Sequence, residues 1–188
     1  MKSKLIILGC GSSMGVPRAD GLWGKCKKNN KKNYRTRCSI IIIKGSNSIL
    51  IDTSPDLRYQ LLSNNIKNIS SVIFTHEHAD HLMGLDDLRL FPFYLGHSVP
   101  LYCEALVEKQ IRKAFAYSFS DQEPTHAGAT PELEFIPIET GVFPVLGTSI
   151  TGLRLHHGPF CVLGFRIGNI AYCTDTNNIP EESWPALA

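Results

Sequence analysis

The sequence lacks any long apolar run. The run LIIL near the N-terminus stops at Gly9 after four residues, whereas the apolar region of a secretory signal needs roughly 7–15. No run approaches the ~18 apolar residues that a membrane helix needs. These absences argue against a secreted or membrane protein, and we expect a cytoplasmic protein with no membrane partner.

Paired cysteines and compositional extremes are also missing. Six cysteines occur among 188 residues, at positions 10, 26, 38, 103, 161 and 173, and no two form a CxxC pair. We therefore expect reduced thiols and not a disulfide framework. Hydrophobic residues make up 43% and charged residues 19% of the chain, which is typical of an ordinary globular core. The length suits one domain over residues 1–188.

Acidic residues are absent from one stretch. Residues 25–37, KCKKNNKKNYRTR, carry seven basic groups and no acid, although the net charge of the whole chain is only +2. The rest of the chain holds 12 basic and 17 acidic residues, a balance of −5. The stretch is either a solvated loop or a patch that steers a phosphate-bearing substrate. RNA is a less favoured ligand, because Tyr34 is the only aromatic residue there for base stacking.

The order of apolar runs and turn residues predicts strands interleaved with helices. A hairpin is expected over residues 38–52, because two β-branched runs flank the turn residues GSN. A helix over residues 56–64 would have Ser54 or Asp56 as its cap and Pro55 in its first turn. Further strands are expected over 4–10, 71–75, 99–103, 133–138, 149–155, 162–167 and 169–174, further helices over 82–89 and 105–117, and a long polar loop over 120–131. This mixture favours a layered α/β or α+β sandwich.

The densest polar stretch of the chain is THEHADH, which directly follows an apolar run. In extended backbone His76 and His78 project to the same side, whereas a continuous helix would separate them by about 200°. The stretch therefore predicts a strand, a bend and a helix start, where Asp80 and His81 converge on these histidines. Imidazole and carboxylate groups that converge in this way are typical metal ligands. The alternative is a polar turn of neutral histidines, which would be costly to bury without partners.

Two downstream residues are candidates for further ligands. Two metal ions about 3.5–4 Å apart, as in many hydrolases, need more ligands than THEHADH supplies. His157 in LRLHHGPF and Asp175 in IAYCTDT lie at predicted strand ends, where binding residues gather. Taken alone, each gives a weak signal, and a strand-end aspartate has a simpler interpretation as a turn or cap residue. His156 competes with His157, and the adjacent Gly158 favours His157.

The chain resembles the metallo-β-lactamase-fold hydrolases over nearly all of its length. The resemblance rests on GCGSSMGVP, SILIDTSPD, THEHADH, the later HHG and a strand-end TD. Within this fold the chain is similar to the phosphodiesterase branch of phosphoribosyl 1,2-cyclic phosphate phosphodiesterase, the PhnP type, and is related to ribonuclease Z. The resemblance implies an α+β fold, an αββα sandwich. Family members continue well past the TD strand, whereas only 13 residues follow Asp175, so a C-terminally shortened sandwich is expected.

The resemblance also implies two divalent metal ions, Zn or Mn, with a defined set of ligands. One ion is expected to bind His76, His78 and His157. The other is expected to bind Asp80 and His81, and Asp175 is expected to bridge the two ions. Asp80 is also the residue that we assign to catalysis.

One supporting residue and one missing ligand follow from the same comparison. Asp52, at the end of SILIDTS, resembles the family's aspartate that supports the metal ligands, with a turn or helix-capping role as the alternative. The family has a further histidine for the second ion, and no histidine follows His157 here. His97, His126, another subunit or water would have to complete that site, so we expect it to be weak.

The implied function is that of a metal-dependent hydrolase. A metal-bound hydroxide would attack the phosphorus of a small cyclic or phosphoribosyl phosphodiester. A nuclease of the ribonuclease Z kind is one alternative, with residues 25–37 as its candidate RNA surface. A truncated metal-binding protein with little activity is the other, supported by the short C-terminus. An unpaired last strand would also favour a homodimer.

Overall fold

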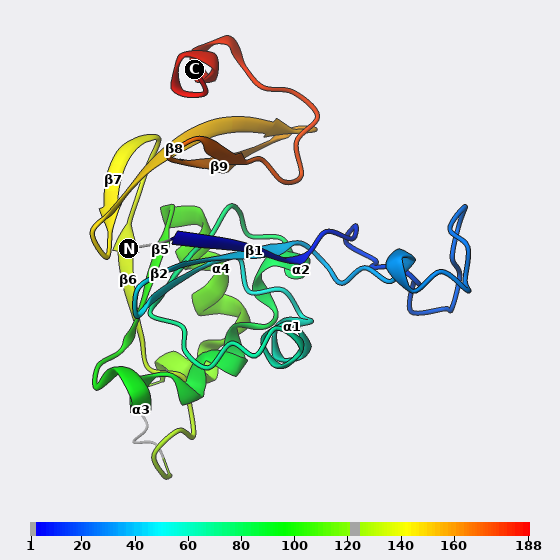
Figure 1. The fold of residues 1–188 in the computed structure, drawn as a ribbon. Helices are drawn as coiled ribbons and strands as arrows, with labels where there is room; N and C mark the ends of the chain where they lie inside the picture. The colour runs from blue at the N-terminus through cyan, green and yellow to red at the C-terminus, as the bar shows by residue number, and fades with distance from the viewer. Residues whose placement is uncertain (1–2, 121–124) are drawn as a thin grey trace.

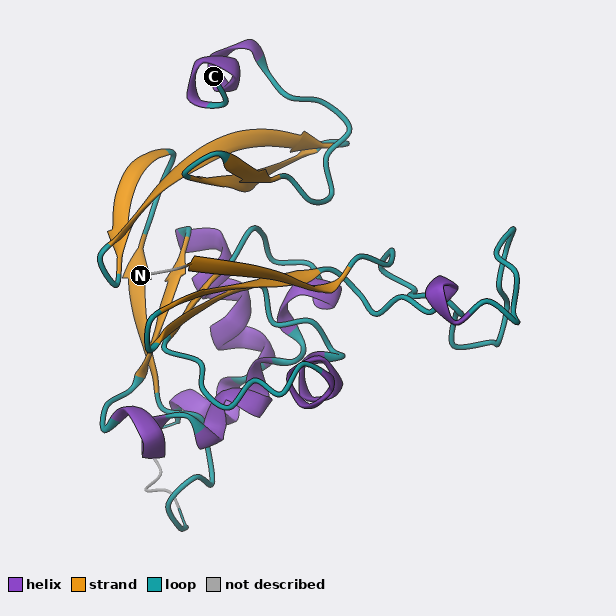
Figure 2. Cartoon of the chain, in the orientation of Figure 1, coloured by secondary structure: helices purple, strands orange, loops and turns teal. Residues whose placement is uncertain are grey.

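The computed structural model describes residues 3–120 and 125–188, which form two β-sheets packed face to face (Figure 1). The larger sheet has six strands in the order β1-β2-β3-β4-β5-β6, and the smaller has four in the order β10-β9-β8-β7. Helices cover the outer face of the larger sheet, and the C-terminal 3₁₀ helix η4 lies over the smaller one (Figure 2). The predicted α+β sandwich of the αββα type is confirmed.

The elements have the following bounds. The larger sheet contains β1 (Ser3–Gly9), β2 (Ser39–Lys44), β3 (Asn47–Ile51), β4 (Ser71–Ile73), β5 (Val99–Cys103) and β6 (Leu133–Pro137). The smaller contains β7 (Gly141–Val145), β8 (Thr148–His157), β9 (Phe160–Ile167) and β10 (Ile170–Tyr172). The α-helices are α1 (Leu57–Ser63), α2 (Ala79–Leu82), α3 (Pro92–Leu95) and α4 (Ala105–Ala114), and the 3₁₀ helices are η1 (Lys31–Asn33), η2 (Leu85–Leu90), η3 (Ala116–Phe119) and η4 (Glu181–Ala186).

The hairpin of β2 and β3 is apolar on both faces because it lies in the middle of the sandwich. Ile41 and Leu50 pack with the helices in one core, and Ile40 and Ile51 pack with the smaller sheet in the other. Side chains alternate between the faces of a strand, so a strand covered on both sides reads as a continuous apolar run. This explains the runs SIIII and SILI that flank the turn.

The parallel strands of the larger sheet bring the predicted site residues to one edge. Strands β3 and β4 are parallel, with Ile51 opposite Ile73. Their carboxyl ends therefore meet at the same edge of the sheet, where binding sites of α/β proteins gather. Asp52 follows β3 directly, and THEHADH begins two residues after β4.

Two predicted helices have the wrong bounds, and one predicted cap differs in detail. The helix expected over residues 82–89 is replaced by α2, which begins inside the motif at Ala79, and by η2. The helix expected over 105–117 ends at Ala114, because Phe115 leaves helical geometry while its side chain stays buried in the core. Of the two predicted caps, Asp56 occupies the N-cap position of α1 but its carboxylate pairs with Arg37, whereas the Ser54 hydroxyl accepts the Asp56 N–H at 3.1 Å.

Strand β7 was not predicted at all. Its sequence, GVFPV, contains a glycine and a proline, which weaken any prediction of a strand. The strand lies at the edge of the smaller sheet, where proline is tolerated because the missing N–H need not pair with a neighbour. The polar loop predicted over 120–131 falls partly outside the described residues.

No helix within residues 3–120 and 125–188 has the length and apolar content that a membrane crossing requires.

Packing between the two sheets can be tested at Phe165. Its side chain is fully buried in the core between the sheets, so we expect Phe165→Ala to lower the free energy of unfolding by about 3–5 kcal/mol. The matched control is Phe93→Ala on α3, where the ring is 57% exposed and the cost should stay near 0.5 kcal/mol. Urea unfolding followed by circular dichroism measures both. Equal losses for the two variants would contradict this assignment of the core.

Candidate metal centre

The motif THEHADH bends sharply between β4 and α2. His78 has an extended backbone at the N-cap of α2, and the helix begins at the next residue. This bend brings the rings together, with 4.6 Å between the centroids of His76 and His78, which meet edge to face, and 4.2 Å between those of His76 and His81. The strand, bend and helix start that the sequence predicted are present, although the helix begins earlier than expected.

The first turn of α2 is held against the segment after β3. The Thr53 N–H donates to the carbonyl of His81 at 2.8 Å, and the Thr53 hydroxyl donates to the carbonyl of Leu82 at 3.0 Å. Gly84 allows this approach, because a Cβ there would lie 2.0 Å from the carbonyl oxygen of Ser54. A glycine is therefore required where the chain leaves the motif.

All six predicted metal ligands lie in two adjoining groups. The first group contains His76, His78, His157 and Asp175. The second contains Asp80, His81 and Asp175, so Asp175 belongs to both groups. Within each group the candidate ligand atoms all lie within 4.8 Å of one another. The residues come from β4–α2, the end of β8 and the segment after β10.

The other histidines weighed from the sequence lie outside both groups. Successive residues of β8 point to opposite faces, so His156 turns away from His157 and its Nδ1 lies 3.2 Å from the Asn178 amide. His97 contacts the carbonyl of Ser98 at 2.7 Å. His126 contacts its neighbour Thr125 at 3.0 Å.

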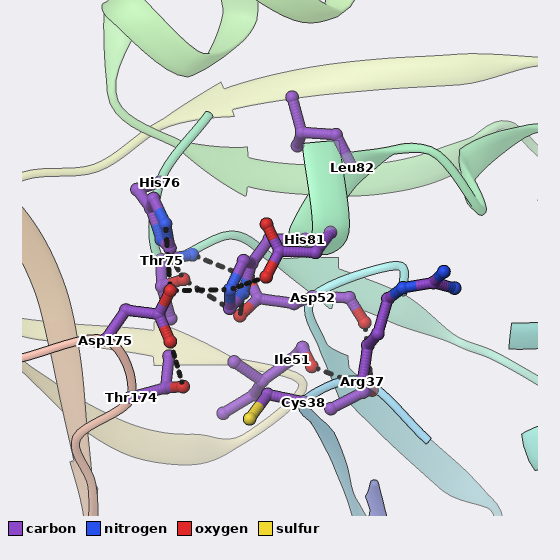
Figure 3. Close-up of polar contacts among 12 residues, drawn as sticks. Arg37, Cys38, Ile51, Asp52, Thr75, His76, His81, Leu82, Thr174 and Asp175 are labelled. Carbon is purple, nitrogen blue, oxygen red and sulfur yellow. Dashed lines mark hydrogen bonds and ion pairs between the residues drawn. The ribbon is translucent and has the colours of Figure 1, made fainter. Parts of the chain in front are cut away.

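A buried carboxylate, Asp52, orders the ligands from behind (Figure 3). Its Oδ1 accepts the Thr75 N–H, and its Oδ2 accepts the Thr75 hydroxyl and lies beside Nδ1 of His81, each at 2.8 Å. Its backbone has a φ of 63°, a left-handed conformation that aspartate tolerates better than most residues. Within the described part of the chain Asp52 bonds no helix N-terminus; it contacts one candidate ligand directly and reaches His76 through Thr75.

The hydrogen bonds of Asp52 and Thr75 fix which nitrogen of His76 is free. A carboxylate only accepts hydrogen bonds, so the single hydroxyl proton of Thr75 goes to Asp52. The Thr75 oxygen, 2.9 Å from Nδ1 of His76, must then accept from that nitrogen. The proton of neutral His76 is therefore on Nδ1, which leaves a lone pair on Nε2.

Burial keeps His76 neutral. Burial, with the positive charge of His81 beside it, lowers the pKa of His76 to about 4. Its Nε2 is buried and has no hydrogen-bond partner among the described residues. A buried nitrogen lone pair without a partner is costly unless something such as a cation occupies the space in front of it.

Charge in the rest of the site is strongly coupled. Burial alone would lower the pKa of His81, but its interactions with Asp52 and Asp175 raise that pKa to about 12. The hydrogen bond from His81 holds the pKa of Asp80 and that of Asp175 below the usual range. His81 would have to release its Nε2 proton to bind a metal, since a ligand histidine coordinates through a deprotonated nitrogen.

The site opens on one side. The side chains of His81 and His76 are 0% and 2% exposed, whereas that of His157 is 35% exposed. Phe160, exposed at the turn between β8 and β9, packs its ring 5.2 Å from that of His78 at an interplanar angle of 85°. A substrate would therefore approach past His157 and Phe160.

Sequence reasoning missed Thr75 and Phe160. A signal for Thr75 was available, because it is the first residue of THEHADH and a hydroxyl next to a ligand histidine can orient the ring. Phe160 gave no such signal, since it reaches His78 only through the pairing of β8 with β9, with His157 opposite Phe160.

The chemistry of the donors fits divalent metal ions. Imidazole and carboxylate groups together suit Zn, Mn and Fe, and the partnerless Nε2 of His76 and the clustered carboxylates are the features that a cation would satisfy. His76, His78 and His157 could hold one ion, Asp80 and His81 a second, with Asp175 between them.

Comparison with known proteins identifies the family. A family model described as a beta-lactamase superfamily domain matches residues 47–188. The chain belongs to the beta-lactamase superfamily. A crystal structure described as a new diphosphatase from the PhnP family has a TM-score of 0.87 and 33% identity to this chain, covering 99% of it and 70% of that structure. The predicted place in the PhnP-like branch of the metallo-β-lactamase fold is confirmed.

Two proteins with similar sequences are much longer than this chain. An octanoyltransferase from Porphyromonas gingivalis is 36% identical over 186 residues, which are 98% of this chain and 37% of that protein. A ribonuclease Z from Treponema denticola is 27% identical over 104 residues, which are 54% of this chain and 29% of that protein. The chain thus spans about a third of the length of these two relatives.

The role of Asp52 can be tested through metal affinity. In Asp52→Asn the amide can present an N–H group to Nδ1–H of His81, so we expect zinc affinity to fall about 10–100-fold. The matched control is Asp56→Asn, four residues away, whose carboxylate pairs with Arg37. Competition with a chromophoric chelator measures both affinities, with circular dichroism as the check on folding. A folded Asp52→Asn protein that binds zinc as tightly as the wild type would contradict this role.

Proposed function

We propose that the chain is a metal-dependent hydrolase that cleaves a small cyclic or phosphoribosyl phosphodiester. The observation that carries this proposal is the pair of adjoining ligand groups that share Asp175. Membership of the beta-lactamase superfamily supports a hydrolase. The proposed metals are Zn or Mn, both of which imidazole and carboxylate donors suit.

In this proposal Asp175 would be the ligand common to both metal sites. Its Oδ2 lies 3.3 Å from Nε2 of His81, 3.8 Å from that of His76 and 3.9 Å from that of His157. One oxygen atom is thus central to both groups. His76, His78 and His157 would form the first site, and Asp80 with His81 the second.

The side chains of the site have separate tasks in the reaction. Divalent metal ions held there would polarise a phosphoryl oxygen and activate water for attack on phosphorus. Asp80, whose pKa the hydrogen bond from His81 holds below the usual range, would place its negative charge at the reacting centre and is the residue that we assign to catalysis. Asp52 and Thr75 hold His81 and His76 in fixed tautomers and orientations. Phe160, whose ring packs edge to face against that of His78, lines the open side of the site.

The class of substrate is supported by the PhnP-family structure reported above. Its description as a diphosphatase of the PhnP family, at 33% identity, favours attack at phosphorus. The octanoyltransferase name is not carried over, because the chain matches only 37% of that protein.

A ribonuclease is the second candidate. Two observations favour it: the similarity to ribonuclease Z over 104 residues and the basic stretch at residues 25–37. Cleavage of a labelled RNA that exceeds cleavage of a small diester would favour this alternative over the first.

The hydrolase proposal predicts turnover that depends on the ligands. Bis-p-nitrophenyl phosphate with added Mn²⁺ or Zn²⁺ should be hydrolysed, and His78→Ala and Asp80→Ala should each reduce the rate about 100-fold or more. The control is His97→Ala, which changes a histidine outside both ligand groups and should leave the rate unchanged. If a metal-loaded wild type is no faster than the two ligand variants, the protein binds metal without this catalysis and the proposal fails.

A further inference from the structure

A long arm projects from the sandwich between β1 and β2 (Figure 1). The arm comprises residues 12–37. Its neck is closed by two backbone hydrogen bonds between Val16 and Arg35, each 2.9 Å long, and by the edge-to-face contact of Trp23 with Tyr34 at 4.7 Å. Beyond this contact lies the tip, residues 24–33, in which nearly every residue is exposed.

The tip is held in a compact form by its own backbone. Cys26 N–H donates to the carbonyl of Trp23, and Asn30 N–H to that of Lys27. The Asn33 amide donates to the carbonyl of Lys27 at 2.9 Å, and the Asn30 side chain accepts the Lys32 N–H at 3.0 Å. The lysines of the tip are thus displayed together on ordered turns.

The positive charge of the tip has no counter-charge in the described part of the chain. All five of its lysines are exposed, and none makes an ion pair within residues 3–120 and 125–188: Lys25, Lys27, Lys28, Lys31 and Lys32. Asp20, the carboxylate nearest in sequence, is 2.6 Å from Arg18 and is already paired. Neighbouring like charges repel one another, so an anionic partner would relieve this strain.

We propose that the arm tip binds the phosphate backbone of a nucleic acid. Eight of the ten tip residues are lysine or asparagine, side chains that donate hydrogen bonds to phosphate oxygens. Protein interfaces have an apolar centre and are poor in lysine, whereas the tip has no apolar side chain besides Cys26. The chemistry of the tip therefore favours phosphates over a protein surface.

The rest of the molecule directs such a ligand to the arm. The body of the chain outside residues 25–37 has a balance of −5 and repels polyanions. The arm is rooted next to the candidate metal centre, because Arg37 pairs with Asp56 at 3.0 Å and the nearby Thr53 bonds to His81. A strand held on the arm would lie at the end of the sandwich that carries the metal ligands. Binding by the arm rests on its charge and shape, and does not depend on the proposed hydrolase activity.

The test is direct binding to metal-free protein. A fluorescein-labelled 20-nucleotide single-stranded RNA of mixed sequence is titrated by fluorescence anisotropy in EDTA at several salt concentrations. If four or five lysines contact phosphates, log affinity should fall with log salt with a slope of about −3. The fourfold variant Lys27→Gln, Lys28→Gln, Lys31→Gln and Lys32→Gln should lose at least about tenfold in affinity at 0.1 M salt and most of the slope.

A charge-matched control separates the effect of the arm lysines on binding from the effect of the net charge of the chain. It carries glutamine at four exposed lysines elsewhere: Lys4, Lys67, Lys109 and Lys113. This variant should bind RNA nearly as the wild type does, and single-stranded DNA of the same sequence should bind the wild type within a few fold, because both ligands share the phosphate backbone.

Four outcomes would overturn the proposal. They are absence of RNA binding by the wild type, equal loss in the arm and control variants, displacement of RNA by an equal charge of polyglutamate, and a wild-type dimer that the arm variant converts to monomer in sedimentation velocity. The last two would show that the arm recognises carboxylates or a second copy of the chain. Each readout is independent of turnover, so failure of the hydrolase proposal and failure of this one are distinguishable.

Discussion

The candidate centre depends on one carboxylate, that of Asp52. Its two oxygens engage the Thr75 backbone, the Thr75 hydroxyl and the His81 ring, so a single group after β3 joins the end of β4 to the start of α2. Its own backbone is held at a positive φ, at a cost of order 1 kcal/mol. Asp175 is held in the same unfavourable region. Strain of this kind persists at sites where the surrounding hydrogen bonds determine the conformation.

This arrangement explains how a cluster of polar groups can be buried at a strand end. The Asp52 carboxylate satisfies one nitrogen of His81 directly and, through Thr75, one nitrogen of His76. The second nitrogen of each ring is thereby turned toward Asp175. Six atoms of Asp52, Thr75, His76 and His81 form the hydrogen bonds that orient the two rings. The remaining ring nitrogens face one small volume shared by both ligand groups.

Much of this could be predicted from the sequence, and the failures have physical causes. The β2–β3 hairpin could be predicted, because turn residues separate two β-branched runs. His157 could be preferred over His156 only weakly, since alternation along a strand shows that one of the two faces the site without showing which. The edge strand β7 was hidden by Gly141 and Pro144. The contact of Phe160 with His78 depends on the register between β8 and β9, and the residues next to Phe160 in the sequence do not reveal that register. The sequence also could not show that the basic stretch lies on a projecting arm. Whether a segment packs against the rest of the chain is a property of the tertiary structure, and no local pattern reveals it.

The central claim is that one cluster provides two metal sites that share Asp175. Native mass spectrometry of the protein titrated with zinc tests it most directly. The wild type should take up two ions per chain, the second more weakly; His157→Ala should remove the tighter ion, Asp80→Ala the weaker one, and Asp175→Ala should weaken both. A folded wild type that retains no zinc, or variants that retain both ions as the wild type does, would contradict the account.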